Sequence, residues 1–191
     1  MPPKPKFTKD KITEIALQII ERDGLESLTA RNLGKELGSS ARPIFTVFNS
    51  MQDVTDAAIK KADDIYASYV NEGLQAPLPF KGVGMAYIRF AEERPKLFQL
   101  LFMKENCALP DTNSVLMDIE TNYGKILNSI CNSYGIAEDI AKKLYLHTWI
   151  YSHGIAVLIA TKVCEFTTEQ ISQMLTDVFI SLLMRAKRGE L

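Results

Sequence analysis

The side chains that most often carry catalysis are few in this sequence and poorly spaced to act together. The only two histidines, His147 and His153, lie six residues apart and therefore on different faces of a helix. No Ser-His-Asp or Cys-His arrangement and no glycine-rich phosphate loop is present. Cys107, Cys131 and Cys164 lack metal-binding or disulfide spacing. We therefore expect no enzymatic activity, no metal, no cofactor and a reducing, cytoplasmic setting; buried reduced thiols are favoured, with a thiol sensor as the alternative.

Arg42 offers a different chemistry, the reading of nucleic-acid bases. A guanidinium can donate two parallel hydrogen bonds to O6 and N7 of guanine, which discriminates against other bases by about 1–3 kcal/mol. Arg42 is the only long donor near the start of a short apolar segment that follows Gly38. We expect base readout from Arg42, and contact with phosphate alone is the alternative. Pro43 beside it could offer only apolar contact, for example with a thymine methyl group.

Short helices must hold Arg42 in place, and the flanking residues predict them. Thr29 can cap a helix whose inward face is Leu33 and Leu37. Gly38 suits the end of this helix because glycine accepts a left-handed backbone without strain. Two short helices around such a turn are typical of a helix-turn-helix, although an αα-corner in an ordinary helical protein has the same local pattern.

A further helix, the third of the N-terminal part, is expected to start at Ser39 or Ser40 and to end at Asn49. Pro43 disfavours helical geometry at Arg42, which can delay the helix start by one residue. The residues available for its core face are Ile44, Phe45 and Phe48.

Helical periodicity continues along the whole chain, which predicts an all-α protein. An apolar stripe on a first helix, from Thr8 to Gly24, follows the i, i+3, i+4 pattern. The expected parts are a flexible basic arm over 1–7, a three-helix helix-turn-helix domain over 8–50, a linking helix over 51–72, and a second helical domain over 80–187. Within the second domain, helices are expected at 82–93, 95–103, 112–134, 137–163 and 168–187, the last with a capping box at 167–170.

The linking helix is expected to bury Val54, Ala58, Ala62, Ile65 and Tyr69. The apolar segment 144–164 is interrupted by histidine, threonine, serine and glycine, so we expect a helix buried on several sides and no membrane span. The first 50 residues carry eight Lys or Arg against six Asp or Glu, a mild excess of +2 in a chain of net charge -1.

The spacing of residues 8–60 resembles the N-terminal domain of the TetR family of transcriptional repressors. The matching positions are Gly24, Thr29, Leu33, Gly38, Ser40, Ile44, Phe45, Phe48, Ser50 and Val54. The resemblance implies a double-stranded DNA operator as partner. The candidate DNA-binding residues are Lys4, Lys6, Thr29, Arg31, Ser39, Ser40, Ala41, Arg42, Pro43, Phe45, Thr46 and Gln52.

The chain departs from the family pattern at several positions that usually touch DNA. Phe45 replaces a tyrosine, Val47 a histidine and Met51 a lysine, while Gly34 and Ser39 stand where alanine and valine are usual. Phosphate contacts supply much of the salt-dependent affinity. The departures therefore predict weaker DNA binding than is typical of the family, or compensation by other residues.

The second half resembles the subgroup of this family whose ligand domain carries a Trp…His-Gly signature. The residues that carry the resemblance are AYIRFAEERPKLFQLLF (86–102) and Trp149, His153, Gly154, Ile155 and Ala156. The resemblance implies an unknown small-molecule effector, with Phe98, Phe102, Met117, Tyr123, Trp149 and His153 as candidate contacts. A core histidine satisfied by hydrogen bonds is the more ordinary interpretation of His153.

In this family the last two helices pair with those of a second subunit. The candidate interface residues are Ile155, Leu158, Ile159, Leu175, Phe179 and Leu182. A homodimer would present two helix-turn-helix domains to a palindromic site. The sequence thus predicts a ligand-responsive transcriptional regulator, most simply a repressor released by a small apolar effector. The alternative is a helical interaction protein of the same origin with weakened or lost DNA binding; effector and operator stay open.

Overall fold

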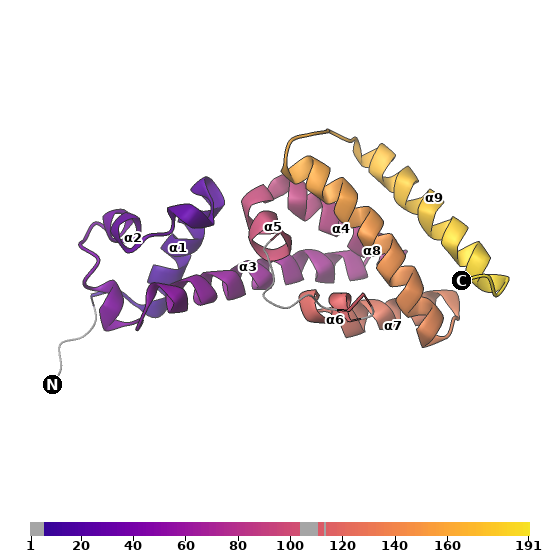
Figure 1. Ribbon diagram of the computed structural model, residues 1–191, viewed down its shortest axis with the longest axis horizontal. Helices are drawn as coiled ribbons and strands as arrows, with labels where there is room; N and C mark the ends of the chain where they lie inside the picture. The colour runs from indigo at the N-terminus through magenta and orange to yellow at the C-terminus, as the bar shows by residue number, and fades with distance from the viewer. Residues whose placement is uncertain (1–5, 104–110, 113) are drawn as a thin grey trace. The chain divides into compact units, whose positions relative to one another are not determined.

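The computed structural model describes residues 6–103, 111–112 and 114–191, and over these residues the chain is all-α, without a strand (Figure 1). It divides into two compact units. Unit 1 comprises Met1–Ile65 and Lys96–Lys104, and unit 2 comprises Tyr66–Pro95 and Glu105–Leu191. The division therefore falls within the long helix α3 (Met51–Leu74). None of the described helices has both the length and the apolar character that a transmembrane segment needs.

Unit 1 begins with the predicted helix α1 (Lys9–Asp23), which Thr8 caps by accepting a hydrogen bond from the Lys11 N–H. After the 3-10 turn η1 (Leu25–Ser27), Thr29 caps α2 (Ala30–Glu36) in the same way. Gly38 then takes the left-handed backbone expected of it, with φ 62°. The core of this unit includes Ile12, Ala16, Ile20, Leu33, Ile44, Phe48, Val54, Ala58, Leu97 and Phe98.

The expected third α-helix over 39–49 is wrong: the structure has one 3-10 turn, η2 (Ile44–Thr46). Pro43 initiates this turn but lacks an N–H to extend a hydrogen-bonded ladder. The Thr46 hydroxyl donates to the Pro43 carbonyl over 2.7 Å, and the backbone leaves helical geometry at Val47. The segment is thus a compact corner in which Ile44 and Phe48 are buried while Phe45 is 46% exposed, so the expected core role of Phe45 is also wrong.

A reciprocal cap fixes the start of α3. The Ser50 hydroxyl accepts the Asp53 N–H and donates to the Asp53 carboxylate, which also accepts the Asn49 N–H. These hydrogen bonds lower the pKa of Asp53. The buried stripe of α3 includes Tyr66 and Val70 after Ala62. The expected continuation through Ile65 and Tyr69 is therefore wrong by one position, and both side chains are only half-buried.

In unit 2, α4 (Pro79–Glu93) packs against α7 (Tyr123–Tyr134), α8 (Glu138–Ala160) and α9 (Thr168–Lys187), as Figure 1 shows. The helix α4 starts three residues before the expected Gly82 because Pro79 occupies the first turn, where its missing N–H is harmless. Thr167 and Gln170 form the predicted capping box of α9. The short helix α5 (Pro95–Phe102) belongs to unit 1 apart from its first residue.

The single helix expected over 112–134 is wrong, since it is broken into α6 (Val115–Ile119) and α7. Glu120 has an extended backbone at the break, with φ -115° and ψ 101°. Its buried carboxylate accepts the Asn122 N–H over 3.0 Å, which fixes the turn. The helix α8 also ends earlier than expected, at Ala160, and Lys162 follows with a positive φ of 58°.

Candidate functional site

The exposed corner of unit 1 depends on an unusually close approach of two backbone segments. The Ser39 N–H donates to the Gly34 carbonyl over 2.9 Å. A Cβ placed on Gly34 would lie 2.9 Å from the Ala41 nitrogen and from the Ser40 carbonyl carbon, closer than real Cβ atoms come. Glycine in place of the usual alanine therefore lets the turn sit directly on α2.

Most of the predicted DNA-binding side chains reach solvent on unit 1. Thr29 and Gln52 are tied locally, to the Asn32 N–H and to Asp56. Lys4 lies outside the described residues, and Lys6 donates to the Ser39 hydroxyl over 3.1 Å. The exposed candidates are Lys6, Thr29, Arg31, Ser40, Arg42, Phe45, Thr46 and Gln52, and the half-buried ones are Ser39, Ala41 and Pro43.

Basic side chains gather beside the corner. Arg31 and Lys35, both exposed, line a surface depression together with residues 39–41. Arg42 is exposed next to it, and among the described residues none of these three cations takes part in an ion pair. Cations without internal partners are suited to phosphate. Lys35 was not among the predicted contacts, although its position four residues after Arg31 on one helix face could have indicated it.

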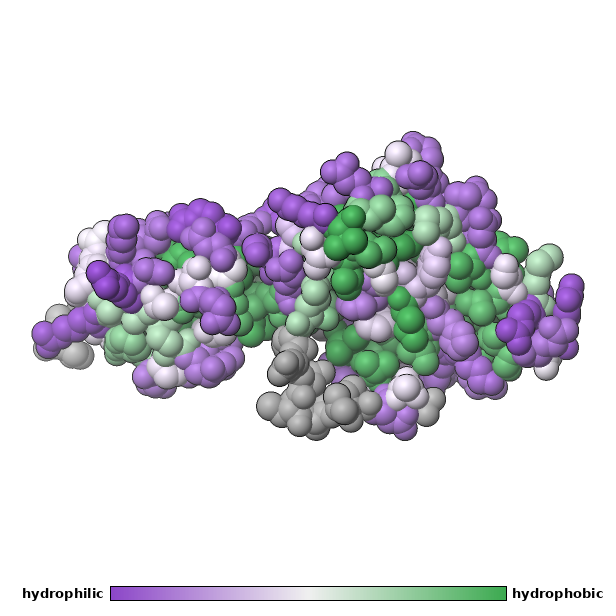
Figure 2. All heavy atoms as spheres, turned by 45° about the horizontal axis from the view of Figure 1, so that its top comes forward, coloured by the Kyte–Doolittle hydropathy of each residue, from purple (hydrophilic) through white to green (hydrophobic). Residues whose placement is uncertain are grey.

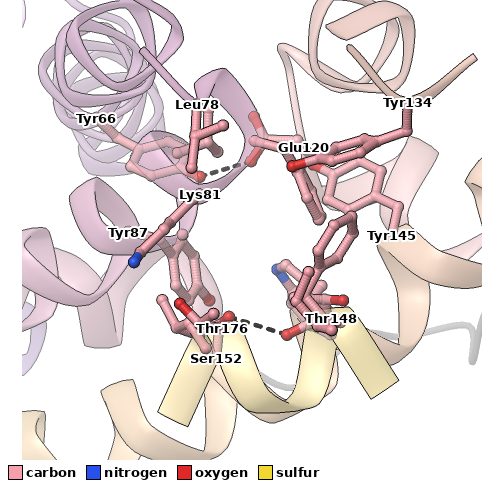
Figure 3. Close-up of a pocket in the computed structure, with 17 residues that line it drawn as sticks. Tyr66, Leu78, Lys81, Tyr87, Glu120, Tyr134, Tyr145, Thr148, Ser152 and Thr176 are labelled. Carbon is pink, nitrogen blue, oxygen red and sulfur yellow. Dashed lines mark hydrogen bonds between the residues drawn. The ribbon is translucent and has the colours of Figure 1, made fainter. Parts of the chain in front are cut away.

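Unit 2 contains a cavity of about 130 Å³ among α3, α4, α7, α8 and α9 (Figure 3). Its wall is mostly apolar and rich in aromatic rings. Tyr145 meets Phe80 edge-on and stacks on Tyr123, so the rings support one another. The aromatic residues of the wall are Tyr66, Phe80, Tyr87, Tyr134, Tyr145, Trp149 and Phe179.

One polar group stands out in this wall, the carboxylate of Glu120. The Tyr66 hydroxyl donates to it over 2.6 Å, as Figure 3 shows. Burial and, secondly, the Glu120 charge raise the pKa of Tyr66 well above its ordinary value. The Thr148 hydroxyl is buried in the same wall and has no hydrogen-bond partner among the residues that the structure describes. The cavity therefore combines an apolar body with a few hydrogen-bonding groups, as ligand sites do.

The structure brings only part of the predicted effector set to this cavity. Trp149 lines it directly. His153 lies behind the wall, where its Nδ1 and the Tyr87 hydroxyl form a hydrogen bond of 2.8 Å, and burial lowers the pKa of His153. Tyr123 backs the wall by stacking on Tyr145. Met117 is exposed on α6, and Phe98 and Phe102 lie on α5 in unit 1.

Sequence reasoning missed Tyr66 and Glu120 as cavity residues. Tyr66 falls one position away from the assumed stripe of α3, and its four-residue spacing from Ala62 was the available signal. Glu120 carried no local signal, because its carboxylate is buried by residues distant in sequence.

The predicted interface residues divide into two groups. Ile155, Leu175 and Phe179 are buried within the protomer, and the latter two line the cavity. Leu158 is exposed, and Ile159 and Leu182 are half-buried.

The exposed large apolar residues of the two helices are taken together here as the α8–α9 face, and one of them, Ile180, also lines the cavity. This face consists of Ile150 and Leu158 on α8 with Ile180 and Met184 on α9. Figure 2 shows hydrophobic side chains at the surface of this part of the molecule.

An exposed corner with free cations in one unit and an aromatic cavity in another are the parts of a two-unit helix-turn-helix regulator. Residues 80–180 match the family model described as Tetracyclin repressor-like, C-terminal domain, which covers more than half of the chain. The chain belongs to the TetR family of transcriptional regulators. No curated protein matches it significantly.

Two solved structures share the fold. A transcriptional regulator from Rhodococcus sp. Rha1 is 13% identical, with a TM-score of 0.63 over 93% of this chain and 97% of that one. The fatty acid degradation regulator FadR from Bacillus halodurans is 14% identical, with a TM-score of 0.51 over 96% of this chain and 97% of that one. At these identities the likeness extends to the fold and no further.

Proposed function

We propose that this chain is a ligand-responsive repressor that binds a palindromic DNA operator as a homodimer in the cytoplasm and releases it when a small effector fills the unit 2 cavity. The observation that carries the proposal is the aromatic cavity, which is lined mainly by the segment that matches the family's C-terminal domain. The exposed cations Arg31, Lys35 and Arg42 support the DNA-binding part of the proposal, because they are available to contact phosphate.

The size of the cavity indicates a small effector. A buried apolar cavity of about 150 Å³ is enough to bind benzene, whereas drug-sized ligands occupy about 300–1,000 Å³. At about 130 Å³, this cavity suits a single ring or an equally small apolar group. A long acyl chain would fit only after the wall had moved.

Helix α3 is the proposed link between ligand and DNA. Tyr66, in the cavity wall, lies on the same helix that begins at Met51, directly after the corner. An effector that displaces Tyr66 would shift α3. This shift would change the spacing between the two helix-turn-helix domains of the dimer. Such coupling is commonly worth about 1–3 kcal/mol of binding free energy.

The α8–α9 face supports the proposed homodimer. Gly154 lies between Ile150 and Leu158 on this side of α8, and a Cβ added to it would meet no atom within 4 Å. The protomer therefore has no need of glycine at this position. A second copy packed closely against the helix would need it, because a small residue lets two backbones approach.

Selection of DNA fragments from a random pool by the purified full chain tests the proposal. We expect enrichment of a two-fold symmetric site, bound with a salt-dependent affinity that an effector weakens. Enrichment of single half-sites would contradict the dimer, and absence of any enriched sequence would contradict specific DNA binding.

A second candidate function is a helical interaction protein without DNA binding. The observation in its favour is Phe45, an exposed apolar ring at the corner where the family usually has a tyrosine. A gel shift across a range of salt concentrations separates the two functions. No shift even at low salt would favour the interaction protein.

A further inference from the structure

One hydroxyl group in the wall of the cavity differs from its neighbours. The Ser152 and Thr176 hydroxyls, also in the wall, each donate to the carbonyl four residues earlier on their own helix, over 2.9 Å and 2.7 Å. This carbonyl is the usual partner of a hydroxyl within a helix. Thr148 is only 6% exposed, and its hydroxyl has neither this partner nor another among the residues that the structure describes. Its hydrogen is therefore available to a bound molecule.

The Thr148 hydroxyl does not help to hold the protomer together. A buried hydroxyl without a hydrogen bond is unfavourable, because it has given up its contacts with water and gained none in return. Valine has nearly the same shape and would fill the same place in α8 without this cost. A ligand group that accepts a hydrogen bond from Thr148 would recover what burial has removed.

The neighbour of Thr148 on the same helix face can complete a second hydrogen bond. Thr148 and Ser152 are four residues apart on α8, and Figure 3 shows both in the cavity wall. The Ser152 hydroxyl uses its hydrogen on the Thr148 carbonyl, but its oxygen keeps lone pairs that can accept. A hydroxyl group on a ligand suits this pair, since it can accept from Thr148 and donate to Ser152.

The rest of the wall determines what carries that hydroxyl group. The wall is mostly apolar and rich in aromatic rings, which pack well against another ring. A neutral hydroxyl needs no countercharge, whereas a charged group would lose its hydration on entering such a site.

We infer that the cavity binds a neutral single-ring compound of the phenol type, with the ring among the aromatic side chains and the hydroxyl group at Thr148 and Ser152. The inference rests on the proposed function in taking this cavity as the effector site. It names the chemical class of the effector and makes Thr148 the residue that selects it.

Phenol and toluene test the inference on the full chain, because they differ only in a hydroxyl and a methyl group. Calorimetry measures both affinities, and Trp149, the only tryptophan, lies in the wall and reports occupancy by its fluorescence. We expect phenol to bind at least as tightly as toluene, although water solvates phenol more strongly. Tighter binding of toluene, or no binding of either probe, would overturn the inference.

A matched pair of variants assigns the preference to Thr148. Thr148→Val removes the hydroxyl, so phenol should lose about fivefold or more in affinity while toluene binds as before or more tightly. Thr176→Val makes the same change at a wall hydroxyl that is already paired, and the ratio of the two affinities should stay the same. Thr148→Ser should keep the preference for phenol. An unchanged ratio in Thr148→Val would contradict the role of Thr148.

The stability of the ligand-free chain is an independent measurement. The urea midpoint of Thr148→Val should equal or exceed that of the natural chain, because no hydrogen bond is lost. Thr176→Val gives up an existing hydrogen bond, so its midpoint should lie below that of Thr148→Val. A midpoint of Thr148→Val below that of the natural chain would show that its hydroxyl is paired in the protein without ligand, and would overturn the inference.

The outcome for the proposed function is separate. Release of the operator by bound phenol, measured as a change in DNA affinity, would support both proposals. Phenol binding that depends on Thr148 but has no effect on DNA affinity would contradict ligand control and leave the phenol site intact. Release by benzoate or by a fatty acid, with no binding of phenol, would support ligand control and overturn the phenol site.

Discussion

Gly82 on α4 and Gly73 on α3 touch backbone to backbone. A Cβ added to Gly82 would lie 2.2 Å from the Gly73 carbonyl oxygen, and one added to Gly73 would lie 2.7 Å from the Gly82 carbonyl carbon. No side chain fits at this crossing, so the pair of glycines fixes how closely α3 and α4 approach inside unit 2. Tyr66 and Tyr87, both in the cavity wall, lie on these two helices.

Gly82→Ala should destabilise unit 2 by about 1–3 kcal/mol or more, because the atoms that would have to yield belong to the backbone. Urea unfolding followed by Trp149 fluorescence measures the loss within this unit. Gly124→Ala is the matched control, since its added Cβ would meet nothing within 4 Å on α7. It should be neutral or stabilise by up to about 1 kcal/mol. Equal effects of the two substitutions would argue against the crossing as described.

Arg42→Ala should reduce the preference for the selected operator over random DNA by about 1–3 kcal/mol without affecting folding, since Arg42 is exposed. Arg42→Lys distinguishes the two interpretations. Lysine preserves a charge for phosphate but cannot form the planar pair with guanine. Retained specificity in Arg42→Lys would therefore assign Arg42 to phosphate. Lys60→Ala, an exposed change elsewhere on unit 1, serves as the control in the same binding titration.

Ile150→Glu should convert the proposed dimer to a monomer. Ile150 is 57% exposed in the protomer, so glutamate is tolerated there, but a carboxylate buried between two copies is unfavourable. Gly154→Ala should weaken the dimer in the same direction while leaving the protomer as stable as before or more so. Sedimentation at several concentrations measures both. Leu25→Glu, at an exposed apolar site of unit 1, should change nothing. A dimer that survives Ile150→Glu would place the interface elsewhere.

Acid should destabilise unit 2 through His153. Burial lowers the pKa of His153 from its ordinary value of 6.5, so the unfolded chain binds more protons than the folded chain between the two pKa values. The stabilisation is fully present above pH 6.5 and is lost as the pH falls from there towards the folded-state pKa. The melting temperature of the natural chain should decline over this range, and His153→Gln should flatten the decline. The lowered pKa of Asp53 acts at lower pH, below the ordinary carboxyl range, and leaves this window undisturbed.

Elements set by local chemistry could be predicted from the sequence, and elements set by distant contacts could not. The caps at Thr8, Thr29 and Thr167 follow from side chains that bond their own backbone within three residues, and each is where it was expected. The helix break at Glu120 could not be foreseen, because Tyr66, which binds its carboxylate, is 54 residues away. Aromatic periodicity likewise indicated a packed interior without showing that Tyr66 would meet Glu120 at a cavity.

The prediction of an α-helix in the corner after α2 was wrong for a different reason. Its residues have the spacing of the family's third helix, but Pro43 and the β-branched residues around it weaken a regular α-helix. Spacing reports which side chains face the core, and here Ile44 and Phe48 do so as expected. It does not determine whether the backbone between them makes one 3-10 turn or three α-helical turns.

The contact at Gly34 has a consequence for exchanging the proposed DNA-reading segment between relatives. Because residues 40–41 rest directly on the bare backbone of Gly34, residues 39–46 are shaped for a neighbour without a side chain. If residues 39–46 were transplanted into a homologue with alanine at this position, the alanine Cβ would clash with residues 40–41. The transplanted segment would then be displaced from α2. A functional chimera must carry α2 together with the segment that follows it.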